Sequence, residues 1–212
     1  MKRAQPFSSW LLFASVALPL PVKESSPQWK IYRYDDLPPN HFEFGPQGLR
    51  VGVDKSVSPL VYVFPQRTTV KGFRLEADFR GLPIRADSKR DDYDDKALRV
   101  GVIVPGRLKP TFLERMIMPK WTNDLIQSVS AEGLEKIYYF SLATANTKNL
   151  SRVVYSRFHE EKVVDVLAAP GPYDKTIDFG RSFEAAAVWL SIDGDDTKSS
   201  YEVLIKRLDL LR

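Results

Sequence analysis

The chain has 212 residues, of which 31 are basic and 27 acidic, so its formal net charge is only +4, and it contains no cysteine. The lack of cysteine excludes disulfides, thiolate nucleophiles and cysteine-ligated zinc. Because the charge is nearly balanced and no run of five basic residues occurs, we expect no nucleic-acid partner.

The chain starts with the charge pattern of a secretory signal peptide, in which a short positive segment precedes an apolar one. Lys2 and Arg3 are followed by the apolar stretch 10–18, which ends at Pro19. This stretch is about half as long as the ~20 residues that a membrane-spanning helix requires. We therefore expect export without a stable membrane span.

The domain organisation follows from this leader. We predict a signal peptide over residues 1–22, cleaved within residues 17–26, and a single domain over residues 23–212 that is periplasmic or secreted. A retained interfacial segment is the alternative. The sequence leaves the oligomeric state open.

Most of the remaining chain predicts β-strands, because short β-branched and aromatic runs are bounded by Pro, Gly, Asp or Ser. In residues 72–80, Phe73, Leu75, Ala77 and Phe79 alternate with charged side chains, which is the pattern of a sheet with one wet face. The expected strands are 29–34, 49–53, 60–64, 72–80, 98–104, 153–158, 163–168, 185–192 and 201–210. This spacing predicts a mainly β fold, an antiparallel β-sandwich that is jelly-roll-like, with an up-and-down barrel as the alternative.

One segment has helical spacing instead. Residues 111–129 carry apolar side chains three to four positions apart and are divided by Pro119, so we expect one or two short helices there. Residues 132–139 fit either a helical turn or a strand.

Three stretches resemble a bacterial family known as domain of unknown function 3047. They are "LRVGVDKSVSPLVYVF" (49–64), "DDKALRVGV" (94–102) and "AVWLSIDGDDTKSSYEV" (187–203), and the resemblance covers most of the chain after the leader. The chain departs from the family in having residues 73–77 where a Trp-rich strand is common, which argues against transferring an aromatic pocket. The resemblance implies an exported β-sandwich and supplies no activity.

Motifs of the common enzyme classes do not occur in the sequence. His159 lacks the second histidine of a helical zinc-protease motif, and we expect both it and His41 to be surface residues. No Gly-x-Ser-x-Gly elbow or phosphate-binding glycine loop follows any expected strand. Carboxylates are plentiful, so acid–base hydrolysis stays open.

Strand 185–192 places Val188, Leu190 and Ile192 on one face and Trp189 on the other. We assign the apolar face to the core. Trp189 is then expected to lie under the helical segment, with the floor of an open groove as the alternative.

An acidic turn follows that strand, with the sequence Asp193-Gly194-Asp195-Asp196. A tight turn explains the glycine through a positive φ angle, but three aspartates exceed what a turn needs. Carboxylates are the ligands that calcium prefers, so Asp193, Asp195 and Asp196 are candidate calcium ligands. A solvated acidic turn is the alternative, and Lys198 in place of the required glycine excludes an EF-hand.

A second acidic cluster, residues 91–95, precedes strand 98–104. If this strand is the antiparallel neighbour of strand 185–192, the two clusters meet at one end of the sheet. Arg99 would then supply a counter-charge that makes a metal unnecessary. The candidate ligand-binding residues are Trp189, Arg99, Asp94 and Asp95.

These features favour a non-catalytic binding module for a glycan or another cell-envelope component. This expectation rests on what exported sandwiches often do. The alternatives are an envelope polysaccharide hydrolase or lyase, and a structural or assembly partner, which would expose a large apolar patch.

Overall fold

The computed structural model describes residues 17–84, 95–108, 111, 119–129, 133–145, 154–155 and 158–212. These residues form eleven strands and one helix, which confirms the mainly β prediction. The elements are β1 (Ala17–Pro19), β2 (Trp29–Ile31), β3 (His41–Gly45), β4 (Gly48–Asp54), β5 (Leu60–Arg80), β6 (Leu98–Leu108), α2 (Lys120–Val129), β7 (Leu134–Thr144), β8 (Val154–Tyr155), β9 (His159–Leu167), β10 (Gly171–Ser191) and β11 (Ser200–Leu211).

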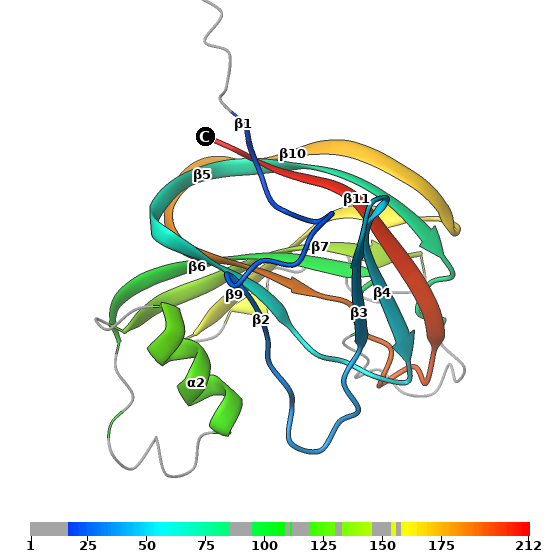
Figure 1. The fold of residues 1–212 in the computed structure, drawn as a ribbon, viewed down its shortest axis with the longest axis horizontal. Coiled ribbons are helices and arrows are strands. Elements are labelled where there is room, and N and C mark those ends of the chain that lie inside the picture. Colours follow the sequence, from blue (N-terminus) through cyan, green and yellow to red (C-terminus); the bar gives the residue numbers. More distant parts are fainter. Residues whose placement is uncertain are drawn as a thin grey trace, which may run out of the picture.

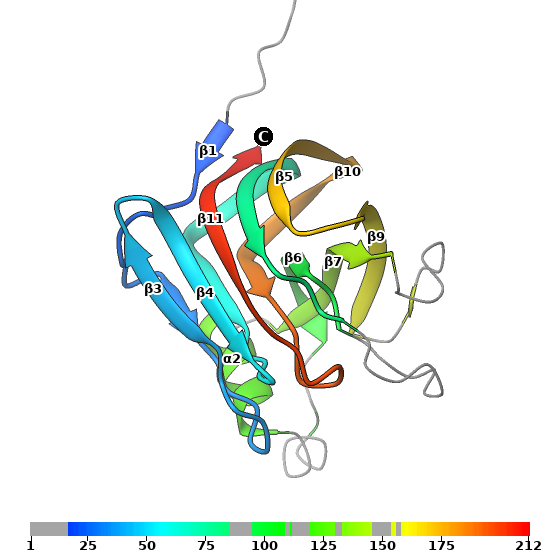
Figure 2. The same ribbon diagram turned by 90° about the vertical axis from the view of Figure 1, so that its right-hand side faces the viewer.

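One continuous sheet folds over on itself to give the two layers of the sandwich (Figures 1 and 2). Strands β5 and β10, each 21 residues long, pair along most of their length and run through both layers. Residues 72–80 of β5 lie beside β11 in the layer that contains β3 and β4. Residues 187–191 of β10 lie beside β6 in the layer that contains β7, β9 and β8. The sandwich prediction is confirmed.

Bulges in β10 bend this long ribbon. The pairing with β5 shifts register between Asp178 and Phe183, and within that interval Gly180 has a φ angle of 75°. On the facing strand, a Cβ atom at Gly72 would lie 2.3 Å from the carbonyl oxygen of Ile177, so a larger residue cannot be placed there. Extra residues on one strand increase its bend and twist, which lets the ribbon turn from one layer into the other.

One pair of neighbouring strands departs from the predicted antiparallel arrangement. Strands β7 and β9 run parallel, with Ile137 opposite His159. Parallel neighbours require a crossover of about a dozen residues, and residues 145–158 provide it. Residues 132–139, which fitted either a helical turn or a strand, contain the start of β7.

The described chain begins with a strand that pairs with the sheet. Strand β1 pairs with β11, and the Leu20 amide donates to the Leu208 carbonyl oxygen at 2.9 Å. Leu20 and Val22 are both buried in the core. Residues 17–22, which the sequence analysis assigned to the leader, are thus part of the domain as the structure has it. Residues 1–16 lie outside the described residues.

The core has two parts. The larger cluster lies between the layers and contains Phe73, Leu75, Val188 and Leu190, which the alternating strands predicted, together with Val100. The smaller cluster lies on the other face of β10, where Trp189 contacts α2. The two faces of β10 therefore pack in two different core clusters. The prediction that Trp189 lies under the helical segment is confirmed.

Helix α2 covers that second face (Figure 1). It follows Pro119, whose carbonyl oxygen accepts a hydrogen bond from the Thr122 amide at 3.1 Å. Leu125 and Val129 are one turn apart and are its buried side chains. Residues 112–118 of the expected helical segment lie outside the described residues. Of the helical structure that is described, nothing has both the length and the apolar character needed to cross a bilayer.

The core assignment predicts that truncating a buried side chain in either layer lowers the free energy of unfolding considerably. Leu75 and Leu190 are 0% and 2% exposed, so Leu75→Ala and Leu190→Ala should each lower the free energy of unfolding by roughly 2–5 kcal/mol. Urea denaturation measures this loss. Glu76→Ala, on the outer face beside Leu75, should change it by no more than about 0.5 kcal/mol. A loss that small at either leucine would contradict the facing of its strand.

Candidate functional site

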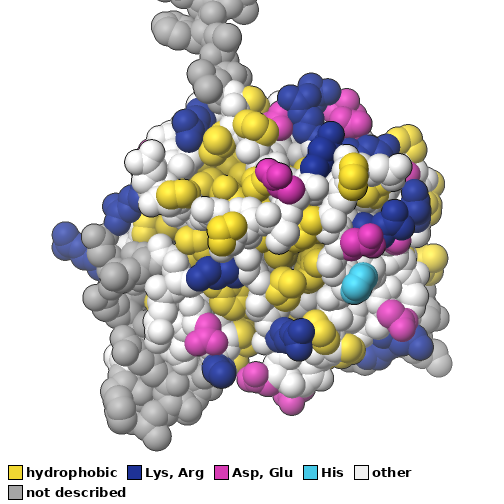
Figure 3. Space-filling model, in the orientation of Figure 1, with side chains coloured by type: hydrophobic (Ala, Val, Ile, Leu, Met, Phe, Trp, Pro, Cys, Tyr) yellow, Lys and Arg dark blue, Asp and Glu magenta, His cyan; other side chains and the backbone are white. Residues whose placement is uncertain are grey.

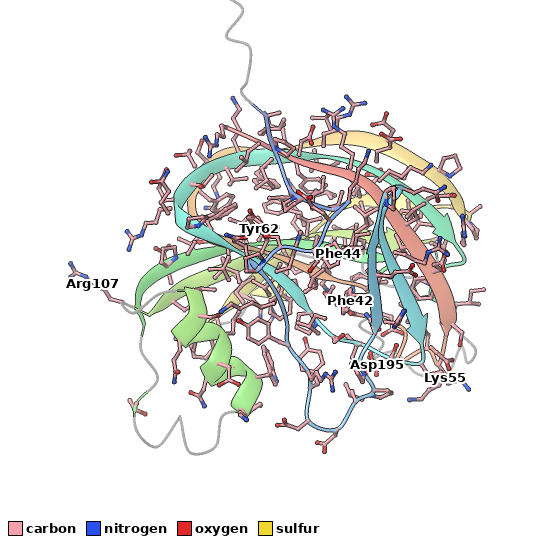
Figure 4. The ribbon with its side chains drawn as sticks, in the orientation of Figure 1. Phe42, Phe44, Lys55, Tyr62, Arg107 and Asp195 are labelled. Atoms are coloured by element: carbon pink, nitrogen blue, oxygen red, sulfur yellow. The ribbon has the colours of Figure 1, made fainter. Side chains whose placement is uncertain are left out.

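A cavity of about 280 Å³ opens beside the start of β6 and the end of β10, and we call it the acidic cavity. Its wall combines aromatic and apolar side chains with five carboxylates and one guanidinium. The lining residues are Tyr34, Leu37, Val57, Asp95, Arg99, Tyr139, His159, Glu161, Trp189, Ser191, Asp193, Asp195 and Asp196. Six of the seven candidate residues from the sequence meet here, and the seventh, Asp94, lies outside the described residues. Figure 4 places Asp195 at one edge of the sandwich, on the same side as Lys55.

The pairing of β6 with β10 brings these residues together. The strands are antiparallel neighbours, with Ser191 opposite Arg99. Asp95, the described member of the cluster 91–95, therefore meets the acidic turn, as predicted, and residues 91–94 lie outside the described residues. The carboxylate of Asp95 accepts hydrogen bonds from the backbone amides of Thr197 and Asp196 at 2.7 and 3.3 Å.

The acidic turn is held in place by residues at or near the ends of neighbouring strands. The Gly194 amide donates to the Ser56 carbonyl oxygen at 3.2 Å, and the Tyr201 hydroxyl donates to the Asp193 carbonyl oxygen at 2.8 Å. A Cβ atom at Gly194 would lie 2.7 Å from Cγ1 of Val53. Close packing therefore explains this glycine. The expected positive φ angle in the turn lies at Lys198 instead, at 55°.

Arg99 forms the buried centre of the site. Its guanidinium pairs with Glu161 at 2.9 Å and with Asp193, and the three side chains are 8%, 9% and 8% exposed. The Ser141 hydroxyl donates a further hydrogen bond to Glu161 at 2.6 Å. The prediction that Arg99 supplies the counter-charge is confirmed for Asp193.

Two carboxyl groups of the cavity have pKa values shifted in opposite directions. Burial alone would raise the pKa of Glu161, but the charges of Arg99 and Lys96 and the hydrogen bond from Ser141 outweigh it and lower the pKa. The pKa of Asp195 is raised, first by burial and then by the charges of Asp95 and Asp196. The ionised form of Glu161 is therefore stabilised, whereas the ionised form of Asp195 is disfavoured by burial and by the neighbouring negative charges.

The predicted calcium site can be tested against this geometry. Arg99 engages the Asp193 carboxylate, and both oxygens of Asp95 accept hydrogen bonds from the turn. Within the ranges that the structure describes, no three His, Cys, Asp or Glu side chains are arranged to hold a metal ion. The residues of the acidic turn do not fit a calcium ion in this arrangement.

Two buried polar atoms in the wall have no hydrogen-bond partner among the described residues, namely Nε1 of Trp189 and Oδ1 of Asp193. Their residues are 2% and 6% exposed. Buried polar groups are nearly always satisfied in folded proteins, so each exception requires an explanation. An unsatisfied donor and an unsatisfied acceptor, judged among the described residues, therefore belong to two residues that line the same cavity.

Aromatic rings line the same wall. Tyr139 packs edge-on against Trp189, with ring centroids 5.7 Å apart, and on its other side contacts His159 at 5.9 Å. Trp121 from α2 packs on the back of Trp189 and also contacts Tyr34. The helix therefore fixes the orientation of the indole from outside.

Sequence reasoning missed several members of the site. Glu161 and His159 reach it on β9, and Tyr139 on β7, through the parallel pairing that no local pattern indicated. His159 is half-buried and lines the cavity, whereas His41 is exposed. The run of three aromatic residues at 138–140 was the available signal for Tyr139.

A second surface lies on another side of the sandwich. Hydrophobic side chains gather over the middle of the face seen in Figure 3, and Figure 4 shows Phe42, Phe44 and Tyr62 there. These rings are half-buried, and Trp29 joins Phe44 and Tyr62 at 6.1 and 5.0 Å. The surface packs against the larger core cluster.

Comparisons with known proteins give only distant similarity. No protein-family model matches the chain, and no curated protein does. Among solved structures, the metal-free form of the VIP36 exoplasmic/lumenal domain has 12% identity and a TM-score of 0.39, with 92% of this chain and 91% of that chain covered. The apo Crh5 transglycosylase has 10% identity and a TM-score of 0.34, covering 92% and 84%. Likeness of this degree identifies neither a ligand nor a site, and the resemblance to domain of unknown function 3047 stays a prediction.

The Arg99 pairs predict a pH-dependent stability. Arg99→Ala leaves two buried carboxylates without their guanidinium, so near neutral pH it should lower the free energy of unfolding by about 3–5 kcal/mol. Because Arg99 lowers the pKa of Glu161, this stabilisation is present above the ordinary glutamate pKa and is lost as the pH falls through the lower folded value. Urea denaturation across this pH range measures it.

Arg74→Ala is the matched control, since Arg74 pairs with Asp174 at 3.0 Å on the exposed surface and should contribute no more than about 1 kcal/mol. An equal or pH-independent cost at Arg99 would contradict its role. Melting curves recorded with excess calcium and with chelator should coincide, because Arg99 already engages Oδ2 of Asp193, both oxygens of Asp95 accept hydrogen bonds from the turn, and the described carboxylates are not arranged as a metal site. A melting temperature that rises with calcium would restore the metal hypothesis.

Proposed function

We propose that this protein is a non-catalytic binding module for a glycan and that the acidic cavity is its binding site. The observation that carries the proposal is the pair of unsatisfied buried atoms, Trp189 Nε1 and Asp193 Oδ1, in one cavity wall. A sugar hydroxyl can accept from the indole N–H, and another can donate to the carboxylate oxygen.

The spacing of these two residues suits a ligand with several hydroxyl groups. Trp189 and Asp193 lie on the same side of the chain, four residues apart, which corresponds to roughly 13 Å along a strand. Both atoms are buried, so a hydroxyl group reaches them only when side chains of the wall shift. The cavity volume is at the lower end of the range for small-molecule sites, which favours one or two sugar rings.

The aromatic wall supports the same ligand class. Tyr34 and Tyr139 supply ring surfaces beside the polar atoms. Rings offer apolar area at a low cost in conformational entropy and can pack against the C–H faces of a sugar. A site built from a few directed polar groups among aromatics is typical of small-ligand recognition.

A glycan hydrolase or lyase is the second candidate function. The opposite pKa shifts of Glu161 and Asp195 favour it, because acid–base catalysis uses one ionised and one protonated carboxyl group. The pairing of Glu161 with Arg99 argues against it, because the guanidinium lowers the pKa of this carboxyl group and so weakens it as a base or nucleophile. Incubation with each bound glycan, followed by mass spectrometry of the products, separates the two candidates.

Export is part of the proposal. The leader pattern of residues 1–16 supports it, and the placement of Leu20 and Val22 in the core supports a processing site ahead of them. Cleavage after Ala17, where Ser15 and Ala17 are the small residues that signal peptidases favour, would preserve both core side chains.

Trp189→Phe tests the proposed site directly. The change retains a ring and removes the indole N–H, so affinity for the glycan selected on an array should fall by about 3- to 10-fold, the effect of one neutral hydrogen bond. Isothermal titration calorimetry measures this change. Trp29→Phe is the control, because the Trp29 N–H donates to the Pro21 carbonyl oxygen away from the cavity. It should lower the melting temperature and leave affinity unchanged. Equal affinities for wild type and Trp189→Phe would place the site elsewhere.

The processing prediction concerns the exported protein. We expect its intact mass to correspond to a chain that starts at Leu18, since this start keeps the partly buried Leu18 as well as Leu20 and Val22 packed on the core. Mass spectrometry of the protein recovered outside the cytoplasm measures this start. A chain that retains Met1, or one that starts at Lys23, would contradict it.

A further inference from the structure

Strand β3 leaves one edge of the sheet open. It stands at one end of the strand order, and among the described residues it pairs with β4 alone. Figure 2 shows β3 at a margin of the described chain. The backbone N–H and C=O groups on its outer side therefore face no other described strand, and such an edge is a template for pairing with a further chain.

The side chains of β3 alternate between the two faces of the sheet. Phe42 and Phe44 pack against the larger core cluster, whereas His41 and Glu43 are exposed. An exposed charge on an edge strand usually discourages pairing with another chain. Here the exposed positions hold an acid and, two residues away, a histidine, which can carry a positive charge. This spacing makes the strand complementary to a second copy of itself.

Two copies of β3 can pair antiparallel with the two-fold axis at Glu43 or at Phe42. With the axis at Glu43, the two carboxylates lie directly opposite each other, where like charges are destabilising. With the axis at Phe42, each His41 lies opposite Glu43 of the second copy, and the two Phe42 rings lie opposite each other on the inner face. An imidazole can donate an N–H to a carboxylate whether it is charged or neutral. The charges therefore favour the axis at Phe42.

The apolar surface described above adjoins the same edge. Its half-buried rings Phe42, Phe44 and Tyr62 lie between β3, at the edge of one layer, and β2, at the edge of the other (Figure 4). Ile31 of β2 is 50% exposed. A stable interface buries about 1,200 Å² or more, which the five residues of β3 do not supply alone. Pairing through β3 brings two such surfaces towards each other, so their apolar area adds to the interface.

We infer that two copies of this protein associate through β3, with Phe42 on the two-fold axis and His41 of each copy against Glu43 of the other. The interface is isologous, so each contact off the axis occurs twice. The inference is independent of the glycan site, because no residue of β3 lines the acidic cavity. A failure of glycan binding therefore leaves it standing.

Charge reversal at the exposed positions tests these contacts. His41→Glu and Glu43→Lys each remove both complementary pairs, so sedimentation equilibrium from micromolar to millimolar concentration should show dimerisation at least about tenfold weaker than in the wild type. An equimolar mixture of the two variants should restore it, because the introduced glutamate then faces the introduced lysine and His41 faces Glu43. The control is Glu184→Lys, an exposed position on β10 with three strands between it and β3, which should leave dimerisation unchanged.

Cysteine substitution tests the position of the axis, because the chain has no cysteine of its own. A residue on the axis lies opposite its own copy with Cα atoms about 4.5–5.5 Å apart, which is within the span of a disulfide. Phe42→Cys should therefore form a disulfide-linked dimer under mild oxidation, and Glu43→Cys should form one at least about tenfold more slowly. Non-reducing gel electrophoresis over time measures both rates.

The opposite results overturn the inference. A wild type that remains monomeric at millimolar concentration refutes it, and so does a dimer that persists in both charge variants. If each variant keeps the wild-type melting temperature but their mixture stays monomeric, the contacts between His41 and Glu43 are refuted. Faster linkage through Glu43→Cys than through Phe42→Cys contradicts the axis at Phe42. A monomer that binds detergent at Tyr62 assigns the apolar surface to an apolar ligand instead.

Discussion

The pairing of β5 with β10 is the constraint on which the rest of the structure depends. Both strands contribute to both layers, so their shared bend sets how the layers face each other and what fills the space between them. The same ribbon also carries Trp189 to the place where β6 begins. The fold and the acidic cavity therefore have one origin, because the strand that joins the two layers ends in the residues that line the cavity.

One part of the cavity is held rigidly by ion pairs, and another part contains buried polar atoms without hydrogen-bond partners among the described residues. Arg99, Glu161 and Asp193 form a buried ionic group, which holds β6, β9 and the acidic turn at fixed distances. Beside it, a buried donor and a buried acceptor remain unpaired. Proteins rarely leave such groups without partners except where function requires it. The rigid part keeps the unsatisfied atoms in position, which is the arrangement expected of a preorganised binding site.

The alternation of apolar and polar residues predicted the strands that have one apolar and one polar face. It missed strands whose two faces are similar in polarity. Residues 72–80 alternate fully between apolar and charged side chains, so their facing was clear, whereas residues 171–178 expose polar side chains on an edge and gave a weak signal. Strand β3 alternates through Phe42 and Phe44 but is short. Within the site, Asp95 and Arg99 could be placed because antiparallel neighbours can be inferred along the chain. Glu161 could not, because it arrives on a parallel strand after a crossover, and sequence spacing does not encode that register.

The order of the strands also constrains how the protein can fold. The first described strand pairs with the last, and β5 must wait for β10, which follows it only after β6 to β9. Contacts between residues so distant in the chain are entropically costly to close and slow to form. The layer that contains β3 and β4 cannot be completed before the last strand, because β11 lies between β4 and β5. That layer therefore lacks its middle until the final residues of the chain are available, whereas the layer of β6 to β9 needs only β10.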